Sequence, residues 1–191
     1  MALIANKRIF TTGEFYHVVC EAVGGMKDMR QAKRKGLIDH ELQNHIMLVV
    51  TEVNGCALCS YVHTKDALEM GMSEEDIQAI LSGSINHLDP KESVALFFAQ
   101  HYAETKGQYS SAAWKRVVDT YGLEKAKGIL GVTKVIMMGN AQGIAFGTLK
   151  NRLKGKPDKK SSLCKELGVI FSTIIFLPVA LLKTAFKKQQ N

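Results

Sequence analysis

The sequence predicts an all-α fold, and three observations lead to that expectation. Apolar residues recur through the first 149 residues at intervals of three and four, the spacing of one helical face. Several segments open with a side chain that can cap a helix, followed by acids in the first turn. No stretch alternates apolar and polar residues convincingly enough to predict a strand. The 191 residues, 46% of them hydrophobic and only three of them proline, can bury a core.

The first two helices are predicted from their apolar faces. One face spans the first segment, and it consists of Phe15, Val18, Val19, Ala22, Val23, Met26 and Met29. After Gly36 the same spacing continues in a second segment, through Leu42, Ile46, Val49, Val50 and Val53. Both segments therefore predict amphipathic helices.

The later helices are predicted from their starts. Ser73-Glu-Glu-Asp76 and Asp89-Pro-Lys-Glu92 each place an acceptor at the cap and acids in the first turn. Ser110 or Ser111 can open the next helix, and Leu123 to Arg152 forms another.

Three glycines in this last segment fall four residues apart, at Gly139, Gly143 and Gly147. Glycines at that spacing form a groove in which another helix can approach closely, although each costs about 1 kcal/mol of helix propensity. Tight packing inside the domain is the favoured interpretation, and a subunit interface is the alternative.

The net charge of +7 belongs to the end of the chain. Residues 150–191 carry ten Lys or Arg and two acids, hence +8, whereas residues 1–149 carry fifteen bases and sixteen acids, hence −1. A nucleic-acid surface needs basic residues clustered on a folded element, so no nucleic-acid partner is expected. The start, Met1 to Gly13, lacks the apolar run of a secretory leader, and a cytoplasmic location is therefore expected.

We divide the chain into a helical domain (1–149), a basic linker (150–162) and an apolar C-terminal helix with lysine flanks (163–191). Leu167 to Leu182 is sixteen residues without a charge, about 24 Å of helix interrupted by Pro178, short of the ~30 Å needed to span a bilayer. Lysines at both ends suit an anionic membrane surface, so peripheral membrane contact is one expectation. Packing on the domain or on a neighbouring subunit is slightly favoured, because an exposed apolar helix promotes aggregation.

The stretch EVNGCALCSYVH, Glu52 to His63, carries the chemistry. Cysteines at i and i+3 on a helix come within disulfide reach once the first turn relaxes, since a bridge needs Cα atoms about 4.4–6.8 Å apart. A position near a helix N-terminus lowers the pKa of a cysteine. His63 follows Cys59 by one turn, and Glu52 precedes Cys56 by one turn if the helix runs back unbroken. These four side chains would form a proton relay beside a redox pair.

Other uses of the two cysteines fit less well. A structural zinc site needs four ligands, but Cys20 and Cys164 are distant single cysteines and the remaining histidines form no ligand-spaced pair. A c-type haem site needs histidine after the second cysteine, where Ser60 stands. A reducing compartment disfavours a disulfide framework. Inert buried cysteines are also disfavoured, because Gly55 precedes the pair and His63 follows it at one turn.

The motif also carries a family resemblance. VNGCALCSYVHTKDALEMGMSEEDIQAI, Val53 to Ile80, resembles the central motif of the alkylhydroperoxidase D-like branch of the carboxymuconolactone decarboxylase family. The shared elements are N-G-C-x-x-C-x-x-x-H-T, an alanine, a glycine and a Ser-Glu-Glu helix start. VIMMGNAQGIAFGTLKNRL is more loosely similar to the family's closing helix, so the resemblance covers Glu14 to Arg152.

This resemblance implies an all-helical fold, a trimeric or hexameric assembly, no metal or organic cofactor, and a peroxide-reducing or disulfide-exchanging dithiol. By position, Cys59 resembles the cysteine that attacks peroxide, Cys56 its resolving partner, and His63 the histidine that assists proton transfer. Decarboxylase members generally lack the cysteine pair. Peroxidase members usually place a glutamate twelve residues before the first cysteine, where this chain has Asn44, and Glu52 and Glu41 are candidate substitutes.

The sequence therefore predicts an antioxidant enzyme that reduces organic hydroperoxides and is itself reduced by a lipoyl- or thioredoxin-type dithiol. One alternative is a decarboxylase- or lactonase-like enzyme that does not use the thiols. Another is a thiol–disulfide reductase or redox sensor that forms the Cys56–Cys59 disulfide without turning over peroxide.

Overall fold

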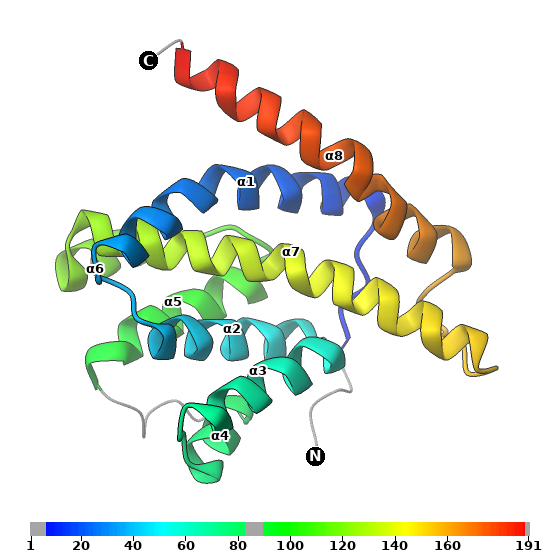
Figure 1. The fold of residues 1–191 in the computed structure, drawn as a ribbon, viewed down its shortest axis with the longest axis horizontal. Coiled ribbons are helices and arrows are strands. Elements are labelled where there is room, and N and C mark those ends of the chain that lie inside the picture. Colours follow the sequence, from blue (N-terminus) through cyan, green and yellow to red (C-terminus); the bar gives the residue numbers. More distant parts are fainter. Residues whose placement is uncertain (1–6, 83–89, 190–191) are drawn as a thin grey trace.

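The computed structural model describes residues 7–82 and 90–189, and within these ranges it contains helices and no strand (Figure 1). The all-α prediction is confirmed. In chain order the helices are α1 (Thr12–Arg34), α2 (His40–Asn54), α3 (Ala57–Glu69), α4 (Glu74–Leu81), α5 (Pro90–Glu104), α6 (Ser111–Tyr121), α7 (Leu123–Leu153) and α8 (Leu163–Gln189).

The helix starts agree with the capping signals in the sequence. The hydroxyl of Ser73 accepts a backbone N–H in the first turn of α4, and the hydroxyl of Ser110, rather than that of Ser111, does so for α6. Pro90 is the first residue of α5, whereas Asp89 lies outside the described residues.

Helix α7 runs through the middle of the molecule, between α1 on one side and α2 and α3 on the other (Figure 1). Glycines allow α1 and α7 to approach closely: a Cβ on Gly131 would lie 2.6 Å from the carbonyl oxygen of Gly25. A Cβ on Gly128 would lie 2.4 Å from the Cβ of Ala32. The close crossing of α7 with α1 therefore uses glycines that the sequence analysis did not single out.

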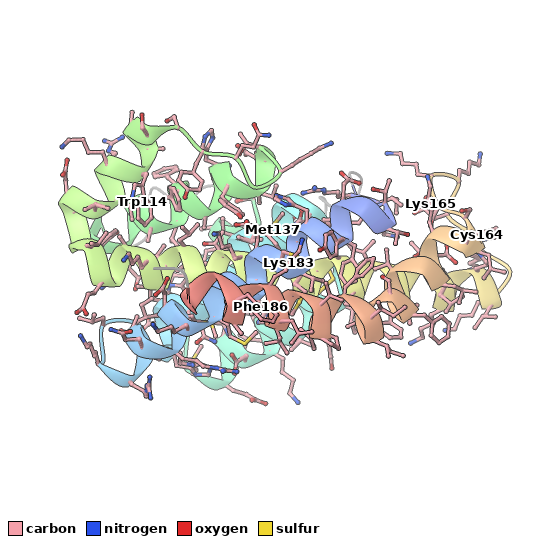
Figure 2. All side chains as sticks on the ribbon, turned by 90° about the horizontal axis from the view of Figure 1, so that it is seen from above. Trp114, Met137, Cys164, Lys165, Lys183 and Phe186 are labelled. Atoms are coloured by element: carbon pink, nitrogen blue, oxygen red, sulfur yellow. A yellow bond between two sulfur atoms is a disulfide. The ribbon has the colours of Figure 1, made fainter. Side chains whose placement is uncertain are left out.

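Helix α8 packs across α1 and α7 (Figures 1 and 2). The guanidinium of Arg152 binds the buried carboxylate of Glu166 through two hydrogen bonds of 2.8 and 3.0 Å. The ring of Phe176 meets the ring of Tyr16 on α1, with centroids 4.9 Å apart. We expected the apolar C-terminal segment to pack on the domain rather than to stay free, and its contacts with α1 and α7 confirm this expectation.

The course of α8 and the end of α7 differ from the sequence-based expectations. The expected interruption at Pro178 is wrong, because α8 continues through it over 27 residues. Pro178 is exposed, so water can satisfy the carbonyl that its missing N–H leaves unpaired. Helix α7 ends at Leu153, one residue after the expected Arg152, so its last turn overlaps the segment 150–162 that we assigned to the linker.

Candidate functional site

The two cysteines lie at a break between helices. Helix α2 ends at Gly55, which adopts a left-handed conformation (φ 69°) that favours glycine, and its N–H bonds back to the carbonyls of Thr51 and Glu52. Cys56 then takes the N-cap position of α3. The unpaired N–H groups at the start of α3 therefore face the first cysteine, which favours negative charge on sulfur there.

Cys56 and Cys59 form a disulfide whose Cα atoms are 5.3 Å apart. The expected disulfide reach of this spacing is confirmed. Cys56 is buried, with 1% of its surface exposed, and its sulfur accepts the backbone N–H of Cys59 at 3.3 Å. Cys59 is half-buried, so it is the more accessible of the two sulfurs.

Helix α7 forms a wall directly against the disulfide. A Cβ on Gly143 would lie 2.6 Å from the sulfur of Cys59 and 2.7 Å from that of Cys56. The carbonyl oxygen of Gly139, one turn earlier, lies 3.8 Å from the Cys59 sulfur. A Cβ on Gly147 would meet no atom within 4 Å. Of the three regularly spaced glycines, Gly143 is therefore the one that makes room for the cysteine pair.

A buried hydrogen bond fixes the end of α2 on α7 beside this contact. The hydroxyl of Thr51 donates to Oδ1 of Asn140 at 2.9 Å, and both side chains are fully buried. Asn140 precedes Gly143 by about one turn, so the bond lies next to the disulfide along α7. This interaction, which sequence reasoning missed, stabilises the position of the segment that joins α2 to α3 and carries Cys56.

His63 and a nearby carboxylate follow the disulfide along α3. His63 lies one turn after Cys59 and is half-buried. Burial lowers the pKa of His63, and the nearby Asp66 carboxylate partly opposes that shift. The lowered pKa favours the neutral imidazole, which is the form that can accept a proton.

Asp66 is held by two side chains of α2. Nδ2 of the buried Asn44 donates to Oδ2 of Asp66 at 2.5 Å, and Nε2 of His40 lies 3.3 Å from the same oxygen. By the resemblance, Asn44 occupies the position at which peroxidases of the family usually carry a glutamate. Its hydrogen bond to Asp66 shows that this position faces α3, at a residue three after His63. Sequence reasoning missed Asp66, although its spacing of three from His63 on one helix was a usable signal.

The expected glutamate candidates lie elsewhere. Glu52 belongs to α2, and the break at Gly55 separates it from α3, so the continuous stripe with Cys56 is not formed. Burial raises the pKa of Glu52. Glu41, near the start of α2, is exposed to solvent.

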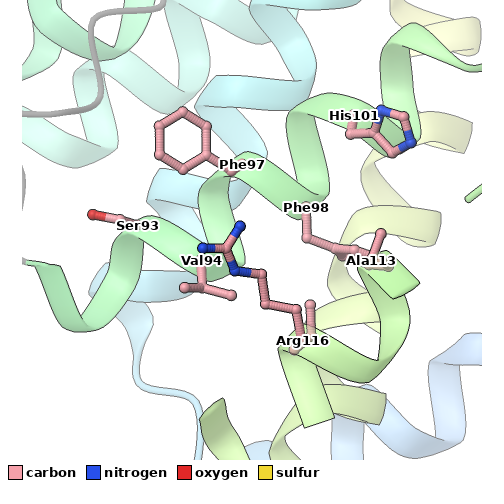
Figure 3. A pocket seen from close by; sticks show the side chains of 8 residues that line it. Ser93, Val94, Phe97, Phe98, His101, Ala113 and Arg116 are labelled. Atoms are coloured by element: carbon pink, nitrogen blue, oxygen red, sulfur yellow. The ribbon is translucent and has the colours of Figure 1, made fainter. Parts of the chain in front are cut away.

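A separate apolar pocket of about 350 Å³ lies between α5 and α6 (Figure 3). Phe97, Phe98 and Val117 contribute to its walls, and the guanidinium of Arg116 extends across it. Its lining comes from neither α3 nor α7, so this pocket is distinct from the disulfide. Among the described residues, no group of three or more His, Cys, Asp or Glu side chains could hold a metal ion.

Comparisons with known proteins agree with the resemblance seen in the sequence. The Carboxymuconolactone decarboxylase family matches residues 21–101, a range that contains Cys56, Cys59 and His63. An uncharacterised protein of Bacillus subtilis (strain 168), YdfG, is 26% identical over 135 residues, which cover 70% of this chain and 92% of YdfG. No solved structure matches. The predicted similarity to this family is confirmed over the matched range.

Proposed function

We propose, from the match of residues 21–101 to the Carboxymuconolactone decarboxylase family and from the site geometry, that this protein reduces organic hydroperoxides with the Cys56–Cys59 pair. The observation that carries the proposal is the disulfide at the start of α3, with the accessible Cys59 one turn from the neutral imidazole of His63. No metal or organic cofactor takes part in the proposed reaction.

The first half-reaction consumes the peroxide. His63 accepts the thiol proton of Cys59, and the thiolate attacks the terminal oxygen of the hydroperoxide. The O–O bond breaks, and the leaving alkoxide takes the proton from His63 to give the alcohol. The sulfenic acid on Cys59 then condenses with the thiol of Cys56, which forms the disulfide and releases water.

The second half-reaction restores the dithiol. A thiolate of a lipoyl- or thioredoxin-type donor attacks Cys59, because its sulfur is the more accessible. Cys56 leaves as a thiolate, stabilised by the N–H of Cys59 and by the start of α3. The second donor thiol then resolves the mixed disulfide and leaves the donor oxidised.

We assign the carboxylate of the proton relay to Asp66 rather than to Glu52 or Glu41. Asp66 is held by Asn44 at the position of the missing glutamate, and its charge favours the protonated form of His63. The imidazole therefore has a partner when it carries the proton taken from Cys59. Asp66→Asn is expected to slow peroxide reduction more than Glu52→Gln, and the reverse order would return the role to Glu52.

The test of function is catalytic consumption of cumene hydroperoxide by the pre-reduced protein with a dithiol donor. Cys59→Ser should abolish consumption, whereas Cys56→Ser should allow a single turnover that stops at a trappable sulfenic acid. The exposed, unpaired Cys164 offers a matched control, and Cys164→Ser should retain full activity. Full cycling in Cys56→Ser would contradict the scheme.

Asn44 favours a second candidate, a thiol–disulfide reductase or redox sensor. The amide cannot act as the base that the resembling peroxidases place there, while the disulfide-forming pair is retained. Such a protein would exchange disulfides with a dithiol donor but consume no peroxide. A decarboxylase- or lactonase-like activity, suggested by the family name, would persist after both cysteines are blocked.

We also expect a homo-oligomer, a trimer or hexamer, from the resemblance. Exposed apolar side chains on α3 are compatible with a subunit contact beside the site, namely Leu58, Tyr61, Val62 and Leu68. Sedimentation of the pure protein measures the assembly directly.

A further inference from the structure

We propose that the outer face of α8, together with the groove between α8 and α1, docks on an anionic lipid bilayer. This inference concerns a surface that the proposed chemistry does not use. It rests on the apolar face of α8, on a groove with a basic rim, and on the charge of the surrounding chain.

Helix α8 has two apolar faces, and only one is covered by the protein. Val169, Phe176 and Ala180 face α1 and α7 and belong to, or pack against, the core. The opposite face exposes between 52% and 73% of each of six large side chains: Phe171, Ile174, Ile175, Leu181, Leu182 and Phe186. Large apolar side chains gathered on one exposed helix face, here called the apolar ridge, are typical of an interaction surface.

A groove continues this ridge toward α1. It is a shallow, open groove of about 750 Å³ where the C-terminal half of α8 passes over the second half of α1. Its apolar floor is formed by Val23, Met26, Met29, Leu181 and Ala185. Its rim carries four basic residues of α1, which are Lys27, Arg30, Lys33 and Arg34. Apolar walls below basic groups complement an anionic amphiphile, whose acyl chain and headgroup need those two environments.

The charge around α8 selects a bilayer over a second copy of the chain. Residues 150–191 carry a net charge of +8, and the exposed turn before α8 contains Lys154, Lys156, Lys159 and Lys160. Two copies that met through α8 would bring these charges together and repel one another. An anionic bilayer instead attracts them while it covers the apolar ridge.

The inner contacts of α8 favour docking on the surface over spanning. By length and composition both α7 and residues 163–186 of α8 could cross a membrane, but 61% of the apolar window of α7 is buried, against 11% for α8. Helix α8 is nevertheless held at one end by the ion pair between the half-buried Arg152 and the buried carboxylate of Glu166. Spanning would expose that carboxylate to lipid or break the pair, whereas surface docking preserves it.

Docking in this orientation leaves the disulfide open to solution. Gln142 of α7 donates to the carbonyl oxygen of Val169 on α8, whereas the adjacent Gly143 faces the disulfide. Figure 1 accordingly shows α8 and α3 on opposite sides of α7. A membrane-docked molecule would therefore still present Cys59 to a soluble dithiol donor.

The test is co-sedimentation of the full chain with vesicles of phosphatidylcholine alone, or of phosphatidylcholine with phosphatidylserine. We expect binding to the anionic vesicles, loss of that binding at high salt, and little binding to the neutral ones. Ile174→Ser with Ile175→Ser, and separately Arg30→Glu with Lys33→Glu, should each weaken binding about tenfold or more.

Matched controls lie away from α8. Leu68→Ser on α3 removes an exposed apolar side chain, and Arg116→Glu on α6 reverses an exposed charge, and both should bind as the parent does. Equal binding to neutral vesicles, or undiminished binding by both double variants, would overturn the proposal. A dimer in solution that Ile174→Ser with Ile175→Ser dissociates would assign the face to a second copy, and resistance of the bound protein to alkaline extraction would indicate spanning.

Discussion

Gly143→Ala tests the contact between α7 and the disulfide most sharply. The added Cβ would lie 2.6 Å from the Cys59 sulfur and 2.7 Å from the Cys56 sulfur. These distances are about 1 Å shorter than ordinary carbon–sulfur contact, so the helix or the disulfide must shift. Overpacking of this kind costs about 1–3 kcal/mol, against a gain of up to about 1 kcal/mol when alanine replaces glycine in a helix.

Gly147→Ala supplies the matched control, because its Cβ would meet no atom within 4 Å. We expect Gly147→Ala to equal or exceed the wild type in unfolding free energy, and Gly143→Ala to fall below it, when both are oxidised and unfolded in urea. Reduction frees the two sulfurs to separate, so the deficit should shrink in the dithiol form. A disulfide-specific penalty of about 1.4 kcal/mol would shift the dithiol–disulfide equilibrium about tenfold toward the dithiol. Equal stability of the two oxidised alanine variants would refute the proposed contact.

Three further outcomes are expected. Since burial lowers the pKa of His63, the unfolded chain takes up a proton that the folded chain does not, and the unfolding free energy should fall as the pH drops below about 6.5. His63→Asn should flatten that dependence, measured by urea titrations across pH, and an unchanged slope would contradict it. Arg152→Met leaves the carboxylate of Glu166 buried without its partner, so it should lower the unfolding free energy, and Arg152→Lys should lower it by less. Limited proteolysis of the segment 154–162 should accelerate in Arg152→Met, and wild-type protection would show that the pair does not hold α8. Asp66→Asn should lower the pKa of His63 further, as read by NMR titration of its imidazole, and a raised pKa would exclude the assigned charge interaction.

Local signals in the sequence predicted the helices and the cysteine pair. Capping serines and apolar spacing act within a few residues, so they specify helix starts and faces without knowledge of the neighbours. The spacing of Cys56 and Cys59 is likewise a local signal, because the N-cap and the third residue of a helix lie close together. The interruption at Pro178 was wrongly predicted, since solvent exposure, and not residue type alone, decides its cost.

Contacts between residues on different helices could not be predicted from local sequence signals. The stripe through Glu52 depended on an unbroken helix, and the left-handed Gly55 breaks it. The proposed role of Asp66 depends also on its hydrogen bond to Asn44 of another helix, which no spacing along α3 reports. Glycine spacing on α7 predicted a close approach, but only the fold shows that Gly143 meets sulfur atoms.

The most direct test of the proposed function is peroxide consumption by the pre-reduced protein, with its intact mass measured on the same sample. Sustained turnover with a dithiol donor, together with a loss of two hydrogens that maps to Cys56 and Cys59, is the expected result. Disulfide formation without turnover would contradict the peroxidase and support the reductase or sensor. If no disulfide forms at all, the redox interpretation fails, and an activity that does not use the thiols takes its place.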